Sequence, residues 1–211
     1  VELAPFQYHA PRSLDDAIGL LDRHGDEARV LAGGQSLVPQ MGARLAQPRH
    51  VIDINGIPKL DRTSQSVGRL RIPTLVRHRD LETPPVDGPL AGLLALVARA
   101  SGPAPIRARG TVCGSLSAAF SASAWCVAGL ALNADVAVRS RSRGARTIPL
   151  ASFFRGAMTT AMEDDEMLVE LQLPILARHA RWGVSEIGRH GFAWPQAVAI
   201  AVYERDEDEM Q

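Results

Sequence analysis

Residues 30–37 read Val-Leu-Ala-Gly-Gly-Gln-Ser-Leu, and this stretch decides how the chain is expected to fold. Its apolar start predicts a short buried strand. The glycine pair permits a tight turn and a close approach of the backbone to other atoms. Ser36 is placed to act as the N-cap of a helix predicted over residues 37–45, with Pro39 tolerated in the first turn. The stretch therefore predicts a strand, a glycine loop and a helix in succession.

The flanking sequence extends this unit into a small lobe. Ser13 followed by Asp16 is a variant of the capping box, and the apolar residues after it favour a helix that ends at Gly25. Another buried strand is predicted over residues 51–54 and ends at an Asn-Gly turn signal. Strands and helices alternate here, which is typical of α/β units. We expect residues 1–57 to form this N-terminal βαβ lobe.

The pattern changes beyond residue 57. Residues 90–97 carry a helical apolar stripe, and residues 116–134 are rich in Ala and Leu and contain a second predicted helix. Residues 135–150 predict a hairpin, and residues 167–173 alternate as a strand does. Strands far apart in sequence together with helices indicate an α+β lobe with a mixed or antiparallel sheet. We expect this second lobe to span residues 58–175.

The last segment, residues 176–211, contains two further strand candidates, residues 182–188 and 197–203. They are followed by an acidic run, which we interpret as a solvated end. We expect residues 176–211 to begin a C-terminal domain that this chain contains only in part.

Composition excludes several classes of protein. The formal net charge is zero, so no overall field favours nucleic acid or an anionic membrane. No apolar run approaches the roughly 20 residues of a membrane span. Cys113 and Cys126 are the only cysteines and form no CxxC pair, which argues against a cysteine-bound iron–sulfur cluster or structural zinc. We expect a soluble, cytoplasmic protein with no metal in this chain.

A second glycine loop, residues 111–115, reads Thr-Val-Cys-Gly-Ser. In both loops a glycine allows backbone N–H groups to face a concavity, and a small hydroxyl side chain adds a donor suited to phosphate oxygens. In the first loop the following helix would also point its N-terminus at an anion. Either loop alone is more often a tight turn, and neither matches the dinucleotide or P-loop fingerprint.

The two loops, taken in order with their flanks, resemble one family. The chain is similar to the FAD-binding medium subunit of molybdenum-containing hydroxylases, of the carbon monoxide dehydrogenase type, which is related to the flavin domain of xanthine dehydrogenase. The agreement runs nearly from end to end. The matching segments are residues 6–9, 11–14, 28–39, 53–55, 77–82, 106–107, 109–112, 114–116, 147–149, 153–154 and 189–191.

The resemblance implies a two-lobed FAD-binding domain of the PCMH type. In that family the first loop binds the FAD pyrophosphate, and the second supports the pyrophosphate and the flavin. The implied partners are an iron–sulfur subunit, which supplies electrons, and a molybdopterin-binding large subunit; the flavin then reduces an external acceptor. A homo-oligomer is an open alternative. The implied cofactor-binding residues are Ala32, Gly33, Gly34, Gln35, Ser36, Thr111, Val112, Cys113, Gly114, Ser115 and Leu168.

The sequence departs from the family at several positions. Cys113 stands where the family usually has glycine, Phe120 stands where it has aspartate, and Pro73 and Val76 replace a glycine and a threonine. A second interpretation is therefore a degenerate member with weak or absent FAD. It would act as a non-redox scaffold, or as a stand-alone enzyme whose pocket Phe120, Val76 and Trp125 make apolar enough for a small apolar substrate.

Two further side chains have alternative interpretations. Near Arg109, Cys113 could form a stabilised thiolate, but a tolerated substitute for glycine is favoured. His78 lies between two arginines, and we expect it on an exposed turn or strand edge.

Overall fold

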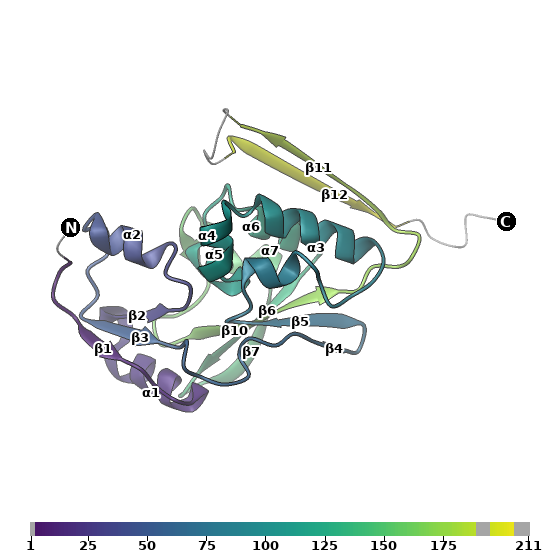
Figure 1. The fold of residues 1–211 in the computed structure, drawn as a ribbon. Helices are drawn as coiled ribbons and strands as arrows, with labels where there is room; N and C mark the ends of the chain where they lie inside the picture. Colours follow the sequence, from purple (N-terminus) through teal and green to yellow (C-terminus); the bar gives the residue numbers. More distant parts are fainter. Residues whose placement is uncertain (1–2, 189–194, 205–211) are drawn as a thin grey trace.

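The computed structural model describes residues 3–188 and 195–204 and arranges them as two lobes with a hairpin beside the larger one (Figure 1). The predictions for residues 189–191 and for the acidic run beyond Glu204 lie outside the described residues. The two lobes are an α/β unit and an antiparallel sheet covered by helices, so the architecture is α+β as the sequence predicts.

The first lobe is a three-stranded parallel sheet in the order β1-β3-β2. In Figure 1, α1 and α2 lie on opposite sides of this sheet. The apolar face of α1 packs on the sheet, burying Ile18 and Leu21 against Ile52 and Ile54. The elements are β1 (Gln7–His9), α1 (Leu14–His24), the 3-10 turn η1 (Gly25–Glu27), β2 (Ala28–Leu31), α2 (Leu37–Gly42) and β3 (His50–Asp53).

Local signals set the boundaries of α1. The Ser13 hydroxyl accepts a hydrogen bond from the Asp16 amide at 3.1 Å, and Gly25 has a φ of +47°, so both predicted ends are confirmed. The prediction for α2 was partly wrong. This helix ends at Gly42 rather than at residue 45, and the Ser36 side chain makes no capping hydrogen bond because the residue already has helical dihedral angles.

The second lobe contains a five-stranded antiparallel sheet in the order β4-β5-β10-β6-β7, and helices cover one face of it (Figure 1). The predicted hairpin is present as β6 and β7. The elements are β4 (Ser64–Ser66), β5 (Arg69–Pro73), η2 (His78–Leu81), α3 (Pro89–Ala100), α4 (Ala104–Arg109), α5 (Val112–Ala118), α6 (Ala124–Ala131), β6 (Asp135–Ser140), β7 (Gly144–Pro149), α7 (Leu150–Phe153), β8 (Phe154–Gly156), β9 (Thr159–Thr160) and β10 (Met167–Pro174).

The stretch predicted to contain one helix, residues 116–134, holds the end of α5 and all of α6. Ala119 adopts a left-handed conformation with a φ of +47° and ends α5. The chain starts α6 at Ala124 after a short turn. Composition alone did not reveal the interruption because alanine favours helix on both sides of it.

The lobes share part of their cores. Leu75 and Met167 belong to the second lobe but pack into the apolar cluster beneath the first sheet, beside Ile52. An ion pair between Asp15 on α1 and Arg139 on β6 also joins the lobes, with an N–O distance of 2.7 Å. These contacts hold the two lobes together.

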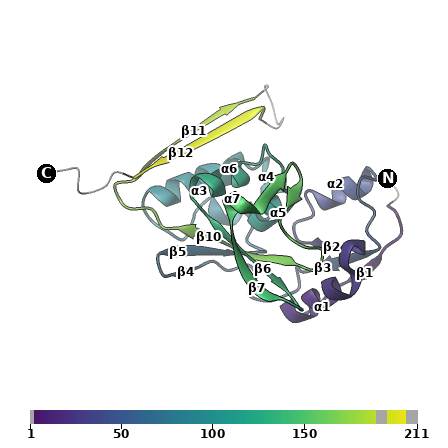
Figure 2. The same ribbon diagram turned by 180° about the vertical axis from the view of Figure 1, so that it is seen from behind.

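A hairpin of β11 (Arg181–Ile187) and β12 (Ala197–Tyr203) lies over α3 and α6, on the side away from the sheet (Figures 1 and 2). The Trp182 indole N–H donates to the Pro89 carbonyl at 2.7 Å and anchors it there. No helix within residues 3–188 and 195–204 has the length and apolar character that crossing a bilayer requires.

Candidate functional site

The first glycine loop joins β2 to α2 and contains backbone donors without protein acceptors. Gly34 has a φ of +74°, a conformation that glycine adopts without strain. Among the described residues, no protein acceptor is hydrogen-bonded to the amides of Gly34, Gln35 and Ser36. The Gln35 side-chain amide donates to the Gly33 carbonyl at 3.0 Å and braces the turn. Successive amides of this kind form a nest suited to an anion.

The second glycine loop is organised differently from the expectation. Thr111 caps α5, its hydroxyl accepting from the Gly114 amide at 3.0 Å. A Cβ on Gly114 would lie 2.6 Å from this hydroxyl, so the glycine is required by the cap. The Ser115 amide also has a protein acceptor, the Thr111 carbonyl. The Val112 amide also has an acceptor, whereas among the described residues no acceptor is hydrogen-bonded to the amides of Thr111 and Cys113.

The two loops touch each other. A Cβ on Gly33 would lie 2.3 Å from the Arg109 carbonyl oxygen. The Arg77 guanidinium bridges them, donating to that carbonyl at 2.5 Å and to the Asn55 side-chain oxygen at 2.6 Å. Asn55 in turn donates to the Ala32 carbonyl at 2.8 Å. One hydrogen-bonded chain thus fixes the first loop relative to the second.

Asp53 orients Asn55 within this network. Its carboxylate accepts hydrogen bonds from the Asn55 backbone N–H at 2.9 Å and from the Tyr8 hydroxyl at 2.5 Å. Burial alone would raise the pKa of Asp53, but these hydrogen bonds outweigh it and lower the pKa. The carboxylate is therefore ionised at neutral pH and remains an acceptor.

Both loops line one cavity of about 680 Å³ between the lobes. This volume is in the range of small-molecule and cofactor sites. The residues that line it come from the first lobe, from the second glycine loop, and from the segment around β9 and the start of β10. Of the residues implied by the resemblance, those that line the cavity are Ala32, Gly33, Gly34, Gln35, Ser36, Thr111, Gly114, Ser115 and Leu168.

Val112 and Cys113 are not among the lining residues, because their side chains point into the core of the second lobe. Cys113 is 1% exposed, and its thiol donates to the Ile72 carbonyl at 3.5 Å. Burial raises the pKa of Cys113 far above its ordinary value. The stabilised-thiolate interpretation was therefore wrong, and the side chain acts as a small apolar group.

His78 also lines the cavity, which corrects the expectation of an exposed position. It is 3% exposed and stacks on Trp125 with ring centroids 6.0 Å apart. Its Nε2 lies 3.5 Å from the Ser115 hydroxyl, and its Nδ1 is buried without a hydrogen-bond partner among the described residues. The flanking arginines gave no sequence signal of this burial.

The protonation state of His78 follows from its surroundings. Burial, and then the charges of Arg77 and Arg107, lower its pKa to about 4. The imidazole is therefore neutral at physiological pH. A neutral imidazole offers one donor and one acceptor to a molecule in the cavity without placing a charge there.

The substitutions thought to make the pocket apolar do not do so. Val76 and Trp125 are buried in the core of the second lobe, and Phe120 is 37% exposed. None of the three is among the residues that line the cavity. The two loops line the cavity with polar groups. Residues 158–168 line it with the apolar side chains of Met158, Met162, Met167 and Leu168 and with the polar side chains of Thr160, Glu163 and Asp164.

The residues present fit a dinucleotide. The unpaired amides at Gly34, Gln35 and Ser36 suit a pyrophosphate, and the hydroxyls of Thr111 and Ser115 add polar groups nearby. The side chains of Met158, Met162, Met167 and Leu168 offer apolar surface suited to a planar ring system. The fold and the site together define an FAD-binding domain.

Comparison with known proteins gives the family. The sequence pattern described as "FAD binding domain in molybdopterin dehydrogenase" matches residues 4–176, and the chain belongs to this family. The chain is 33% identical to the carbon monoxide dehydrogenase medium chain of Hydrogenophaga pseudoflava over 197 residues, covering 93% of this chain and 68% of the relative. It is also 33% identical to the caffeine dehydrogenase subunit beta of Pseudomonas sp. (strain CBB1) over 206 residues, covering 96% and 70%.

Solved structures agree. A carbon monoxide dehydrogenase chain from Hydrogenophaga pseudoflava superimposes with a TM-score of 0.92 at 32% identity, covering 98% of this chain and 71% of that chain. Quinoline 2-oxidoreductase from Pseudomonas putida 86 gives a TM-score of 0.88 at 29% identity, covering 98% and 71%. The predicted family, fold and FAD cofactor are confirmed, and the chain is an FAD-binding oxidoreductase subunit of the carbon monoxide dehydrogenase medium-subunit type.

Proposed function

We propose that this chain is the electron-transfer flavin subunit of a molybdenum hydroxylase-type oxidoreductase. A molybdopterin-binding large subunit passes electrons to an iron–sulfur subunit, which passes them to the flavin of this chain. The flavin then delivers them to an external acceptor. The observation that carries the proposal is the convergence of both glycine loops on one cavity, with three amides of the first loop unpaired among the described residues.

This chain's own residues bind and orient the cofactor. The amides of Gly34, Gln35 and Ser36 hold the pyrophosphate, and the Arg77–Asn55 bridge keeps the two loops at a fixed spacing. Bound FAD supplies the redox chemistry. The side chains of Met158, Met162, Met167 and Leu168 would offer apolar contacts to the flavin ring system.

We infer that the other implied residues act less directly. Thr111 and Ser115 contribute hydroxyls, and Val112 and Cys113 support the second loop from the core. Leu168 forms part of the apolar wall. We assign cofactor positioning to these side chains and no catalytic step.

We also propose that residues 1–57 and 58–175 are the lobes of the FAD-binding domain and that residues 176–211 begin a further domain. The separate sheets support the first division, since the parallel sheet ends at Asp53 and the antiparallel sheet begins at Ser64. The unpaired thiols of Cys113 and Cys126 support a reducing, cytoplasmic location.

Flavin reconstitution tests the cofactor part of the proposal. The purified chain, mixed with excess FAD and desalted, is expected to retain flavin absorbance in a 1:1 ratio. Its unfolding free energy should rise by about 2.7 kcal/mol when free FAD is 100-fold above Kd. A chain that retains no flavin and shows no FAD-dependent rise in Tm contradicts it.

Co-expression tests the electron-transfer part. The chain, produced with the iron–sulfur and molybdopterin-binding subunits of its own source, should copurify with them. Adding the enzyme's reducing substrate should then bleach the flavin. Flavin that binds but stays oxidised in the assembled complex contradicts the proposed electron route while leaving cofactor binding intact.

A further inference from the structure

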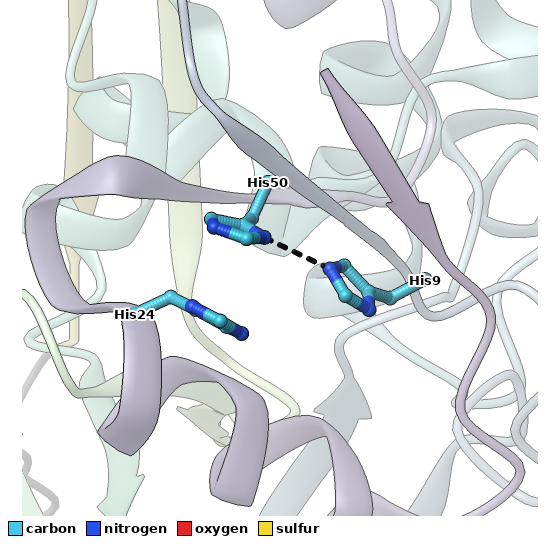
Figure 3. A group of neighbouring side chains, drawn as sticks. All are labelled: His9, His24 and His50. Carbon is cyan, nitrogen blue, oxygen red and sulfur yellow. Dashed lines mark hydrogen bonds between the residues drawn. The ribbon is translucent and has the colours of Figure 1, made fainter.

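Three histidines that are distant in sequence meet beside the first sheet, and none of them is among the residues that line the flavin cavity (Figure 3). His9 ends β1, His24 ends α1 and His50 begins β3. His9 Nε2 and His50 Nδ1 are 3.0 Å apart, and the rings of His24 and His50 stack with centroids 3.6 Å apart. One ring nitrogen from each residue lies within 4.8 Å of the other two.

We propose that His9, His24 and His50 form a binding site for a divalent late transition-metal ion, of which zinc is the expected occupant. Zinc binds imidazole nitrogens at about 2.0–2.1 Å in a tetrahedral array, which places ligand nitrogens about 3.3 Å apart. The His9–His50 pair is already close to that separation at 3.0 Å. One ring nitrogen of His24 lies within 4.8 Å of the other two, and metal binding would require this stacked ring to rotate and the His9–His50 hydrogen bond to break.

The donor set selects the class of ion. Three neutral imidazoles suit zinc, copper, nickel and cobalt, whereas magnesium and calcium prefer oxygen ligands. The fourth position is open to water. The carboxylate of Glu27, three residues after His24, forms an ion pair with Arg49 at 3.2 Å.

The site has a structural role rather than a redox one. His50 pairs with Ala28 at the beginning of β2, whereas the first glycine loop follows Leu31 at the other end of that strand. A bound ion would cross-link β1, β3 and the end of α1. An ion that binds only the folded state stabilises that state. The site would therefore stabilise the first lobe.

Metal titration tests the site. The chain, produced without a histidine tag and stripped with a chelator, is titrated calorimetrically with Zn²⁺, and Co²⁺ is added separately as a spectroscopic probe. We expect one Zn²⁺ per chain, a higher Tm with Zn²⁺, and visible Co²⁺ bands typical of tetrahedral coordination. Replacing one ligand, in His24→Gln or His50→Gln, should weaken Zn²⁺ binding at least about tenfold.

The control is His179→Gln, which alters an exposed histidine outside the cluster and should leave the affinity unchanged. Retained FAD uptake and far-UV circular dichroism show that each variant folds. X-ray absorption of the zinc-loaded wild-type chain, which needs no variant, should give three imidazole ligands at about 2.0 Å. The proposal is overturned if Zn²⁺ binds the ligand variants as tightly as the wild type, meaning an adventitious ion only, or if fewer imidazoles surround the zinc.

Discussion

Gly33 packs directly on the backbone of Arg109, where a Cβ would lie 2.3 Å from the carbonyl oxygen. The two residues are where the first lobe's loop meets the second lobe's loop. Glycine at this position is therefore needed for the contact between two protein segments, independently of any ligand. The distance between the two walls of the cavity depends on it.

Gly33→Ala should separate the loops. The added methyl group cannot be accommodated without moving the Arg109 backbone, so we expect a loss of about 1–3 kcal/mol in unfolding free energy and a marked loss of FAD affinity. Chemical denaturation and flavin retention measure the two effects. Gly56→Ala is the matched control, since a Cβ there meets no atom within 4 Å; equal behaviour of the two variants would contradict the prediction.

The cap of α5 should show coupling between Thr111 and Gly114. Thr111→Ala removes the hydroxyl that accepts from the Gly114 amide, at a cost of about 1 kcal/mol. Gly114→Ala places a Cβ 2.6 Å from the same hydroxyl and should cost more. In the double variant the clash is absent, so the combined loss should be smaller than the sum. Denaturation of all four proteins tests this, and strict additivity would refute it.

His78 should make the protein less stable in mild acid. Its folded pKa is about 4 against an ordinary value of 6.5. The unfolded chain therefore binds more protons between these values, and stability falls as pH drops from 6.5 toward 4. The loss approaches about 3 kcal/mol at the lower end of the window.

The variant His78→Phe, which retains a ring to stack on Trp125, isolates this contribution. The unfolding free energy, measured from pH 7 to pH 4, should decrease less steeply for the variant than for the wild type. His9 and His24 also have lowered pKa values, but they are the same in both proteins and cancel in the difference. Parallel pH profiles would show that His78 is not buried and neutral.

Glu166 should hold the segment beside the cavity. Its carboxylate accepts two hydrogen bonds from Arg146, both at 2.7 Å, and one from the Glu163 amide at 2.9 Å. Glu166→Gln leaves the arginine without its charged partner, and we expect a loss of about 2 kcal/mol in unfolding free energy. Glu186→Gln, on the exposed face of β11, is the control and should change little.

The pH dependence gives Glu166 a second test. Burial would raise its pKa, but the hydrogen bond from Arg146 and further contacts outweigh this and lower it from 4.5. The stabilisation is therefore present above pH 4.5 and is lost as pH falls through the lowered value. The wild type and Glu166→Gln should converge in stability below that range. A stability gap that persists in strong acid would contradict the assignment.

Much of the fold could be predicted because its signals are local. The helix that begins after Ser13 and ends at Gly25, the β6–β7 hairpin and the alternating strand β10 all follow from residue spacing. Predictions were weaker where the same local signal fitted more than one structure. Alanine-rich residues 116–134 fit one helix or two, and only the left-handed turn at Ala119 separates them.

The site was less predictable than the fold. The two glycine loops could be found from sequence, but their different use of hydrogen bonds could not. The buried His78 and the Arg77–Asn55 bridge were missed because neighbouring residues gave no sign of them. The histidine cluster was missed because its members are 15 and 26 residues apart and fit no metal-binding spacing.

The sequence by itself determined the order of the main strands, helices and glycine loops and several of their ends, such as those of α1, and the residues in these segments indicated the family. These features depend on neighbours within a few positions along the chain. The tertiary structure alone decided which amides lack acceptors, that Cys113 faces the core, that His78 is neutral, and that three histidines converge. Burial and contact depend on segments that are distant in sequence, and only folding brings those segments together.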